Sequence, residues 1–225
     1  MNLKEVVGKE AVNYVKDGMI VGLGTGSTVF YFVHALAEKV KEGLNIEMVS
    51  TSIQTVELAK SLGLVIKELE EIDHIDLAVD GVDEIDKNFN AIKGGGAALF
   101  REKIVADIAE KIIWIFDESK DVEKLGNFNL PVEILPFGYS HTIRKMEKLG
   151  LNPVLRLKDG KTLVTDNYNY IVDLHLGYGF DIDEVKNKLA GIIGVVEHGL
   201  FLNMCDLCIS GTPNGAVVIE NPNKK

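Results

Sequence analysis

The sequence predicts an α/β protein of two domains, and three observations support this fold class. Through the first half of the chain, short apolar runs alternate with stretches whose apolar residues recur at helical spacing. The pattern changes near Asn129-Leu130-Pro131, after which strand-like runs outnumber helical ones. The 225 residues are 46% hydrophobic and 26% charged, which is enough for a buried core in one large or two modest domains.

The first half is expected to form a parallel sheet with helices on both faces. Its charged residues before Gly18 recur at helical intervals, and the first strand-like run follows them. This β–α–β alternation predicts a Rossmann-like domain. The expected strands are Met19–Leu23, Ile46–Val49, Leu64–Ile66, Ile75–Val79 and Ile112–Phe116, and the expected helices are Val29–Val40, Ile53–Leu62 and Ala97–Lys111.

The second half is expected to form a smaller α+β domain. Two helices and about four strands follow one another in the order βαββαβ, which is typical of a ferredoxin-like domain. Two further strands are expected within Leu207–Ile219, around the turn Gly211–Gly215. The strands of the small domain are expected at Val132–Leu135, Val154–Leu157, within Leu163–Leu176 and at Gly194–Leu200, and its helices at Ser140–Leu149 and Ile182–Leu189.

The charge and the apolar runs exclude several classes of partner. A net charge of −10 argues against nucleic acid, because binding to phosphate backbones depends on clustered Lys and Arg. No run approaches the length of a membrane span, since the densest, Val29–Ala37, is interrupted by His34. The N-terminal residues lack the apolar region of a signal peptide. We therefore expect a cytoplasmic protein without a membrane partner.

Cys205 and Cys208 have the spacing Cys-x-x-Cys, but two features argue against a metal or redox site. No other cysteine completes a four-thiolate zinc site. The flanking residues are strand-like, and positions three apart in a strand point to opposite faces. Two reduced structural cysteines are therefore expected, with a redox pair as the alternative.

Ligands of open parallel sheets bind beyond the carboxyl ends of the strands, so the loops that follow the strands are the candidate sites. The first such loop contains Thr25-Gly26-Ser27-Thr28 between a strand and a helix, and it offers backbone N–H groups and three hydroxyls. Its glycine spacing matches neither the dinucleotide nor the nucleoside triphosphate motif. A single phosphate or carboxylate fits it better, and the alternative is a tight turn with a helix cap.

The second and third loops carry hydroxyls and carboxylates. Ser50-Thr51-Ser52 precedes a helix, and capping that helix explains its hydroxyls. Asp80-Gly81-Val82-Asp83 follows an apolar run, and a turn there lets both carboxylates converge on one ligand. A divalent metal is conceivable, but the loop lacks the alternating spacing of a calcium loop. Solvent-exposed turn aspartates are the alternative.

The most informative segment is Lys93-Gly94-Gly95-Gly96, which precedes a helical pattern. Three successive glycines allow the backbone to approach a ligand closely. In the helix that follows, Glu102 lies at the edge of the apolar stripe. Partial burial there would raise its pKa towards the value that a general base needs. A solvated surface glutamate is the alternative.

These motifs together resemble those of the type A ribose-5-phosphate isomerase family, and the resemblance extends over essentially the whole chain. An aldose–ketose isomerase of sugar phosphates needs an anion site, a proton carrier and a cation beside an enediolate. The motifs that carry the resemblance are Gly24–Thr28, Asp80–Glu84, Lys93–Ala98, Arg101–Lys103, Asp117–Lys120 and Gly211–Gly215.

The resemblance implies interconversion of ribose 5-phosphate and ribulose 5-phosphate without metal or organic cofactor. Glu102 would be the base that moves a proton between C1 and C2, and Lys93 would stabilise the enediolate oxygen. Asp80 and Asp83 would hold sugar hydroxyls, and Asp80 is also a candidate for opening the furanose ring. The remaining substrate contacts that it implies are Thr25, Gly26, Ser27, Thr28, Gly81, Val82, Gly94, Gly95, Gly96 and Lys120, with Lys4 as a weaker candidate.

The family fold further implies a discontinuous catalytic domain, residues 1–129 and 203–225, with a small domain of residues 130–202. It also implies a homodimer or, in some members, a homotetramer. Two other function classes stay open. A sugar-phosphate-sensing module would not require both Glu102 and Lys93, and an amino-sugar phosphate deaminase would require a catalytic histidine near the acidic loop, where His74 is more consistent with a structural role. An acyl-CoA transferase of the same broad fold is a further alternative.

Overall fold

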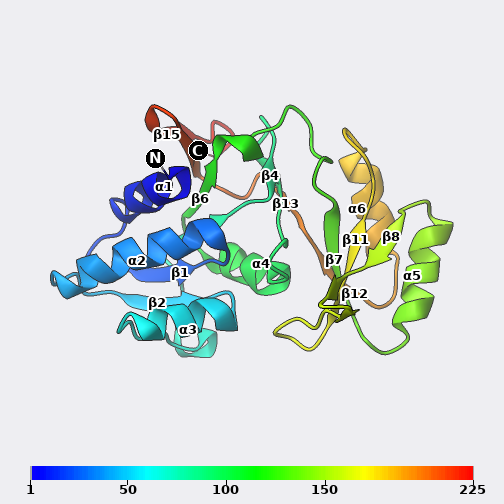
Figure 1. Cartoon of the computed structure of the whole chain (residues 1–225), viewed down its shortest axis with the longest axis horizontal. Helices are drawn as coiled ribbons and strands as arrows, with labels where there is room; N and C mark the ends of the chain where they lie inside the picture. Colours follow the sequence, from blue (N-terminus) through cyan, green and yellow to red (C-terminus); the bar gives the residue numbers. More distant parts are fainter. Residues whose placement is uncertain (1, 225) are drawn as a thin grey trace. The chain divides into compact units, whose positions relative to one another are not determined.

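The computed structural model describes residues 2–224, and they divide into two compact units (Figure 1). Unit 1 comprises residues 2–82, 101–121 and 203–224, and unit 2 comprises residues 83–100 and 122–202. Among the described residues, no helix is long and apolar enough to cross a membrane.

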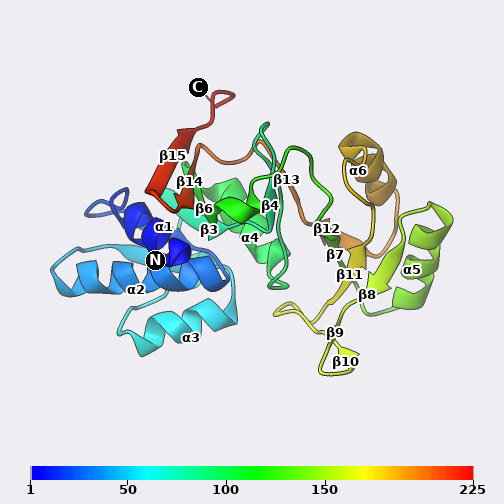
Figure 2. The same cartoon turned by 45° about the horizontal axis from the view of Figure 1, so that its top comes forward.

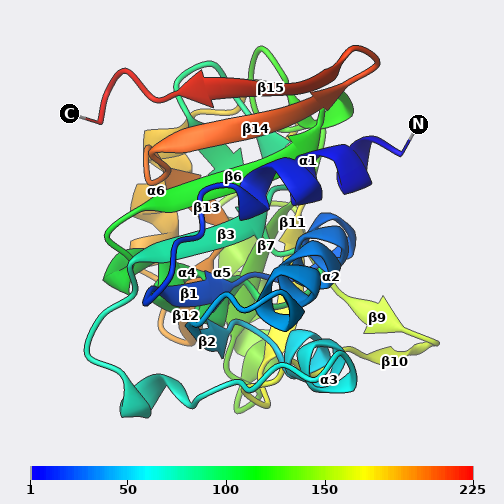
Figure 3. The ribbon, with the colours of Figure 1, turned by 90° about the vertical axis from the view of Figure 1, so that its left-hand side faces the viewer.

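Unit 1 is built on a six-stranded sheet in the order β15-β14-β6-β3-β1-β2, whose strands lie side by side in Figure 3. The strands β1, β2, β3, β6 and β14 are parallel to their neighbours among these five, and β15 closes an antiparallel hairpin with β14 at the edge. The strands are β1 (Ile20–Leu23), β2 (Glu47–Ser50), β3 (Leu77–Gly81), β6 (Ile112–Asp117), β14 (Leu207–Thr212) and β15 (Gly215–Glu220).

Helices cover both faces of this sheet, as the sequence predicted. The helices α1 (Leu3–Val12), α2 (Ser27–Lys41) and α3 (Ile53–Ser61) share one apolar core with the sheet and lie in front of it in Figure 3. Helix α4 (Leu99–Ile108) contributes Val105 to the other face. A Cβ at Gly22 of β1 would lie 2.7 Å from Val105 Cγ1, so the glycine permits this close packing. The boundary between the two units falls within α4.

The main sheet of unit 2 has the order β12-β7-β11-β8 with antiparallel pairs throughout. This is the predicted βαββαβ arrangement, and both helices contribute to one core, through Met146 of α5 and Leu189 of α6. The elements are β7 (Leu130–Ile134), α5 (Tyr139–Lys148), β8 (Pro153–Leu155), β11 (Tyr170–Leu174), α6 (Ile182–Ala190) and β12 (Val195–His198).

Unit 2 also contains a three-stranded sheet that the sequence did not predict. It joins β4 (Glu84–Ile85), β5 (Asn90–Ile92) and β13 (Leu200–Leu202) in the order β13-β5-β4. The buried Glu84 accepts hydrogen bonds from the N–H groups of Gly126 and Phe128, at 2.8 and 2.9 Å. Because of these contacts, residues 83–100 and 122–129 lie in unit 2, whereas the sequence-based boundary assigned both segments to the catalytic domain.

Several expected elements differ in detail. Leu64–Ile66 is not a strand, and the extended run Leu163–Leu176 contains only β11 as a named strand. The expected strand Gly194–Leu200 divides into β12 and the start of β13, because Gly199 N–H bonds to the carbonyl of Pro131 between them. The remaining short elements are η1 (Leu69–Glu71), η2 (Glu118–Lys120), β9 (Leu157–Lys158) and β10 (Lys161–Thr162), the last two forming the hairpin visible in Figure 2.

The two cysteines correct one expectation. Cys205 lies before β14 rather than within it, and its Sγ is 3.7 Å from Sγ of Cys208. The side chains therefore do not point to opposite faces, because strand geometry does not apply at Cys205. Both thiols are free and buried, and their contact together with burial raises the pKa of Cys205.

Candidate functional site

The carboxyl ends of four parallel strands bring the predicted loops of unit 1 to one edge of the sheet. Leu23, the last residue of β1, pairs with Ser50 of β2 and with Val79 of β3. Gly81 of β3 pairs with Ile115 near the end of β6. The loops after these strands therefore share one edge, as expected for a ligand site in a parallel sheet.

The loop after β1 turns sharply into α2. Gly26 is the N-cap residue of α2 with φ of 111°, a conformation that favours glycine, and Ser27 is the first residue of the helix. The first N–H groups of a helix attract anions. A cation stands beside them, because Lys4 Nζ of α1 donates to Ser27 Oγ at 2.9 Å.

Thr25 faces inward and connects this loop to the loop after β2. Its Oγ1 lies 2.7 Å from Thr51 Oγ1 and donates to Ser52 Oγ at 2.8 Å. Ser52 also caps α3 by accepting the N–H of Thr55 at 3.2 Å. Of the three hydroxyls predicted to cap a helix, that of Ser52 does so, and the hydroxyls of Thr51 and Ser52 form part of a buried network that fixes Thr25.

Asp80 is held at the end of β3 by backbone donors. Its Oδ1 accepts the N–H of Thr25 at 3.0 Å and the N–H of Gly81 at 2.7 Å. The residue is only 7% exposed, and a Cβ at Gly24 would lie 2.0 Å from the same oxygen. Gly24 therefore leaves the space that the carboxylate occupies.

A cavity of about 680 Å³ opens in unit 1 beside the α1 and α2 N-termini. Lys4, Gly26, Ser27 and Asp117 line it, and so do five residues that the sequence motifs did not indicate: Asn2, Leu3, Phe30, Tyr31 and Gln54. Asp117 could have been predicted from the sequence, because it ends the strand β6 and belongs to the motif Asp117–Lys120 that carries the family resemblance.

Asp117 adds a stable negative charge to this cavity. Burial raises its pKa, but the hydrogen bonds from Ser119 and the nearby charges of Lys120 and Lys4 outweigh burial and lower the pKa overall. The carboxylate accepts the Ser119 N–H at 3.2 Å, which shapes the turn η2 that carries Lys120. Lys4 and Asp117 thus line the cavity, and Lys120 is close enough to Asp117 to lower its pKa. The two lysine charges exceed the one carboxylate charge, and a dianionic phosphate would complement the excess.

Glu102 lies in the first turn of α4, and the residue is 6% exposed. This burial is what its position in the helical pattern predicted. A carboxylate that is largely removed from water is a common feature of general bases.

Lys93 of unit 2 is also buried, at 2% exposure. Its N–H donates to the carbonyl of Gly199 at 2.9 Å, and its Nζ lies 5.3 Å from the centroid of the Phe201 ring. A Cβ at Gly199 would lie 2.1 Å from the Lys93 carbonyl oxygen. The backbone contact with Gly199, just before β13, and the cation–π attraction to Phe201 of β13 thus fix a buried cation just after β5.

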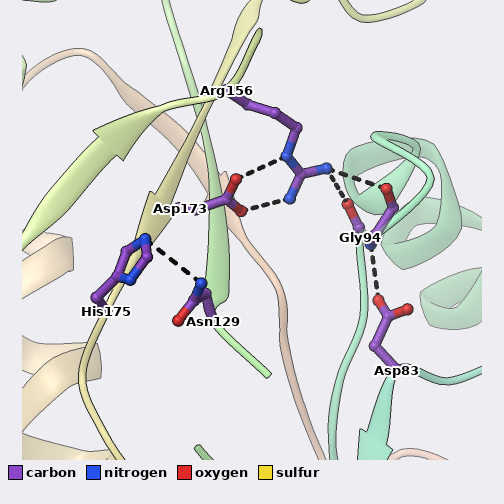
Figure 4. Close-up of polar contacts among 7 residues, drawn as sticks. Asp83, Gly94, Asn129, Arg156, Asp173 and His175 are labelled. Carbon is purple, nitrogen blue, oxygen red and sulfur yellow. Dashed lines mark hydrogen bonds and ion pairs between the residues drawn. The ribbon is translucent and has the colours of Figure 1, made fainter. Parts of the chain in front are cut away.

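The glycine run after Lys93 forms a turn that side chains hold on two sides (Figure 4). The N–H of Ala97 donates to the Gly94 carbonyl at 3.0 Å, and the N–H of Gly95 donates to Asp83 Oδ2 at 2.7 Å. On the other side, Arg156 donates to the carbonyls of Gly94 and Gly95 at 2.8 and 3.1 Å. Sequence reasoning missed Arg156, because it lies some 60 residues from the turn.

The sequence-predicted site residues are divided between the two units. Unit 2 contains Asp83, Lys93, Gly94, Gly95 and Gly96. The structure of unit 1 brings the loop at Thr25 together with Asp80. The unit 1 members are Thr25, Gly26, Ser27, Thr28, Asp80, Gly81, Val82, Glu102 and Lys120.

Comparison with known proteins gives consistent matches over nearly the whole chain. The family described as ribose 5-phosphate isomerase A (phosphoriboisomerase A) matches residues 47–215. Ribose-5-phosphate isomerase A of Levilactobacillus brevis is 55% identical over 220 residues, which cover 97% of this chain and 96% of that protein.

Solved structures agree with the sequence matches. The ribose 5-phosphate isomerase from Plasmodium falciparum superposes with a TM-score of 0.93 at 38% identity, covering 98% of both chains. A D-ribose-5-phosphate isomerase in complex with phospho-erythronic acid superposes with a TM-score of 0.92 at 38% identity, covering 98% of this chain and all of that one. The similarity therefore extends over both units.

Proposed function

The chain belongs to the ribose-5-phosphate isomerase A family, and from this premise we propose which residues perform the family's reaction. The protein is an isomerase that interconverts D-ribose 5-phosphate and D-ribulose 5-phosphate through an enediol. The family match decides against the sensing-module, deaminase and acyl-CoA transferase alternatives. A related structure holds phospho-erythronic acid, a phosphorylated sugar acid, which supports a sugar phosphate as the ligand of this chain.

Glu102 is the base that moves the proton between C1 and C2. The observation that carries this assignment is a carboxylate of 6% exposure, nine residues after the buried cation Lys93. A base must be close to the C–H group and poorly solvated to abstract a weakly acidic proton. Glu102 takes the proton from one carbon and returns it to the other.

Lys93 stabilises the negative charge that develops on the enediolate oxygen. A cation of 2% exposure interacts more strongly with this charge than a solvated one, because water does not screen it. Gly94, Gly95 and Gly96 allow the backbone to approach the sugar closely.

The acidic loop holds the sugar hydroxyls. Asp80 and Asp83 accept hydrogen bonds from them. When the furanose ring opens, Asp80 also takes the proton of the C1 hydroxyl and returns it to the ring oxygen as the bond between C1 and that oxygen breaks. Gly81 and Val82 lie between the two aspartates and complete the loop that binds the sugar. Thr25 supports Asp80 through the hydrogen bond at 3.0 Å described above.

The phosphate group binds at the N-terminus of α2. Gly26, Ser27 and Thr28 supply the first N–H groups and hydroxyls, and Lys4 and Lys120 supply positive charge. This local attraction is needed because the chain as a whole carries a charge of −10.

We further propose a cytoplasmic homodimer that needs no cofactor or metal. The strand β15 supports the dimer, because Val217, Val218 and Ile219 at this sheet edge are 45%, 41% and 39% exposed. Apolar sheet edges are normally covered, and a second copy of the chain is the covering partner that we propose. The two free thiols are typical of a reducing compartment.

Turnover by the purified protein tests the function directly. We expect protein treated with a chelator and then dialysed to convert ribose 5-phosphate into ribulose 5-phosphate at the rate of untreated protein. Loss of activity that added magnesium or zinc restores would contradict the metal-free mechanism. Absence of turnover in both samples would contradict the function itself.

A further inference from the structure

Arg156 of unit 2 is held in place by a two-point ion pair. It lies between β8 and β9, and its Nε donates to Asp173 Oδ2 at 2.8 Å, while its Nη2 donates to the other oxygen, Oδ1. The pair is largely buried, since the Arg156 and Asp173 side chains are 14% and 19% exposed. Strand pairing fixes their approach, because the Arg156 N–H also donates to the Ile171 carbonyl at 2.8 Å.

The remaining nitrogen of the guanidinium group points at the glycine turn (Figure 4). Nη1 donates to the Gly94 carbonyl at 2.8 Å and to the Gly95 carbonyl at 3.1 Å. Only a planar group with several fixed donors can bind a carboxylate with one edge and two carbonyls with the other. A lysine ammonium at this position would lack that geometry.

The two carbonyl contacts set the direction of two peptide groups. In a trans peptide the C=O and the following N–H point in opposite directions. When Arg156 holds the Gly94 carbonyl, the Gly95 N–H is directed away from it, and this N–H reaches Asp83 Oδ2 at 2.7 Å. When Arg156 holds the Gly95 carbonyl, the Gly96 N–H is likewise directed away from Arg156.

We propose that Arg156, oriented by Asp173, is a positioning residue for isomerisation: it fixes the peptide groups of Gly94–Gly96 and thereby the places of Lys93 and Asp83. Three successive glycines have little conformational preference of their own, so the turn needs an external support. The proposal rests on the assignment of Lys93 and the glycine run to the reacting part of the substrate. Arg156 itself does not touch substrate.

The test compares Arg156→Met, Arg156→Lys and Asp173→Asn with a control that weakens the same unit elsewhere. The control is Val172→Ala, because Val172 is fully buried in the core of unit 2 and neighbours Asp173 in β11. Steady-state kcat and KM for ribose 5-phosphate are measured together with thermal unfolding and hydrogen exchange of the peptide that covers residues 93–98.

For Arg156→Met we expect kcat to fall about 10- to 100-fold and KM to change less than about threefold, because misplaced catalytic groups affect the reaction more than binding. Exchange in residues 93–98 should rise about 10-fold, as the turn opens more often. Val172→Ala should lower the unfolding temperature with kcat unchanged. Normal kcat in Arg156→Met, or unchanged exchange at the turn, would overturn the proposal.

Arg156→Lys carries the test should the methionine variant fail to fold, since it keeps the charge and loses the planar group. Its kcat should also fall while its unfolding temperature stays normal, and full activity in this variant would overturn the proposal.

The variant Lys93→Ala separates the positioning role of Arg156 from the catalytic role of Lys93. Near-normal turnover in Lys93→Ala would overturn the catalytic role of Lys93. Amide hydrogen exchange of residues 93–98 would still show whether Arg156 holds the glycine turn. If both claims hold, adding Arg156→Met to Lys93→Ala lowers kcat by a smaller factor than Arg156→Met does in the wild-type protein, because one of the two groups that Arg156 positions is already absent.

Discussion

The place of the Asp80 carboxylate depends on Gly24, a residue without a side chain. Two backbone N–H groups fix its Oδ1, and the space around that oxygen exists only because position 24 is glycine. The carboxylate is thereby removed from water while its hydrogen bonds are kept, which is the arrangement that a buried charged group requires. Gly24 therefore determines where the Asp80 carboxylate can lie.

Gly24→Ala tests this relation. The new Cβ would lie 2.0 Å from Asp80 Oδ1, so the carboxylate must rotate away from its donors. We expect kcat/KM to fall about 100-fold, as for other displaced catalytic groups, together with a lower unfolding temperature. Gly191→Ala is the matched control, because its nearest contact would be 3.7 Å away. Wild-type kcat/KM in Gly24→Ala would show that Asp80 needs no fixed position.

At the scale of elements, the α1 and α2 N-termini and the turn η2 form the phosphate site that we propose. Each element contributes one kind of group: α1 a lysine, α2 its first N–H groups, and η2 a second lysine beside Asp117. The substrate phosphate is bound in both the ground state and the transition state, so these groups contribute binding that is uniform along the reaction.

Lys4→Gln and Lys120→Gln should therefore raise KM with little change in kcat. A hydrogen bond between charged groups contributes about 1.5–3 kcal/mol, so KM should rise about 10-fold or more in each variant. Lys9→Gln is the control on α1, because its side chain is 66% exposed and pairs with Glu5. A fall in kcat at constant KM would instead place these lysines beside the reacting carbons.

Local sequence patterns predicted the elements of both main sheets but not the three-stranded sheet. The strands β4 and β13 contain two and three residues; β4 pairs with the next strand, β5, and β13 pairs with β5 from more than 100 residues away in the sequence. Such short strands carry no periodic signal, because pairing rather than propensity forms them. The run Leu163–Leu176 suggested more strand than the structure contains, since apolar residues in loops resemble those in strands.

The site could be predicted where its residues follow strands or begin helices. The loops at Thr25 and Asp80 have this position, and Glu102 has a helical phase that predicts its burial. Arg156 could not be found in this way, because its partners Asp173 and Gly94 become neighbours only through tertiary structure. Residues that orient other residues leave no motif in a single sequence.

At the scale of the whole molecule, the edge strand β15 is the surface that we expect a second chain to cover. Its residues Val217, Val218 and Ile219 are 45%, 41% and 39% exposed, so folding of one chain leaves them partly uncovered. Light scattering after size-exclusion chromatography should therefore give twice the mass of one chain.

Val218→Lys should reduce that mass to one chain, because a charge at the edge prevents pairing. Val65→Lys is the control, since Val65 is 76% exposed outside any strand and should leave the dimer intact. A monomeric wild-type protein, or a Val218→Lys variant that keeps the double mass, would contradict an interface at β15.

We propose that Glu102 transfers the proton, and exchange of the substrate C2 proton with deuterated water reports that transfer. Glu102→Gln keeps the size of the side chain but cannot accept the proton, so both exchange and turnover should fall about 1,000-fold with normal unfolding. The control is Glu110→Gln, at an exposed position just after α4. This variant should catalyse exchange of the substrate proton at the wild-type rate. Exchange by Glu102→Gln within a few-fold of wild type would contradict the mechanism.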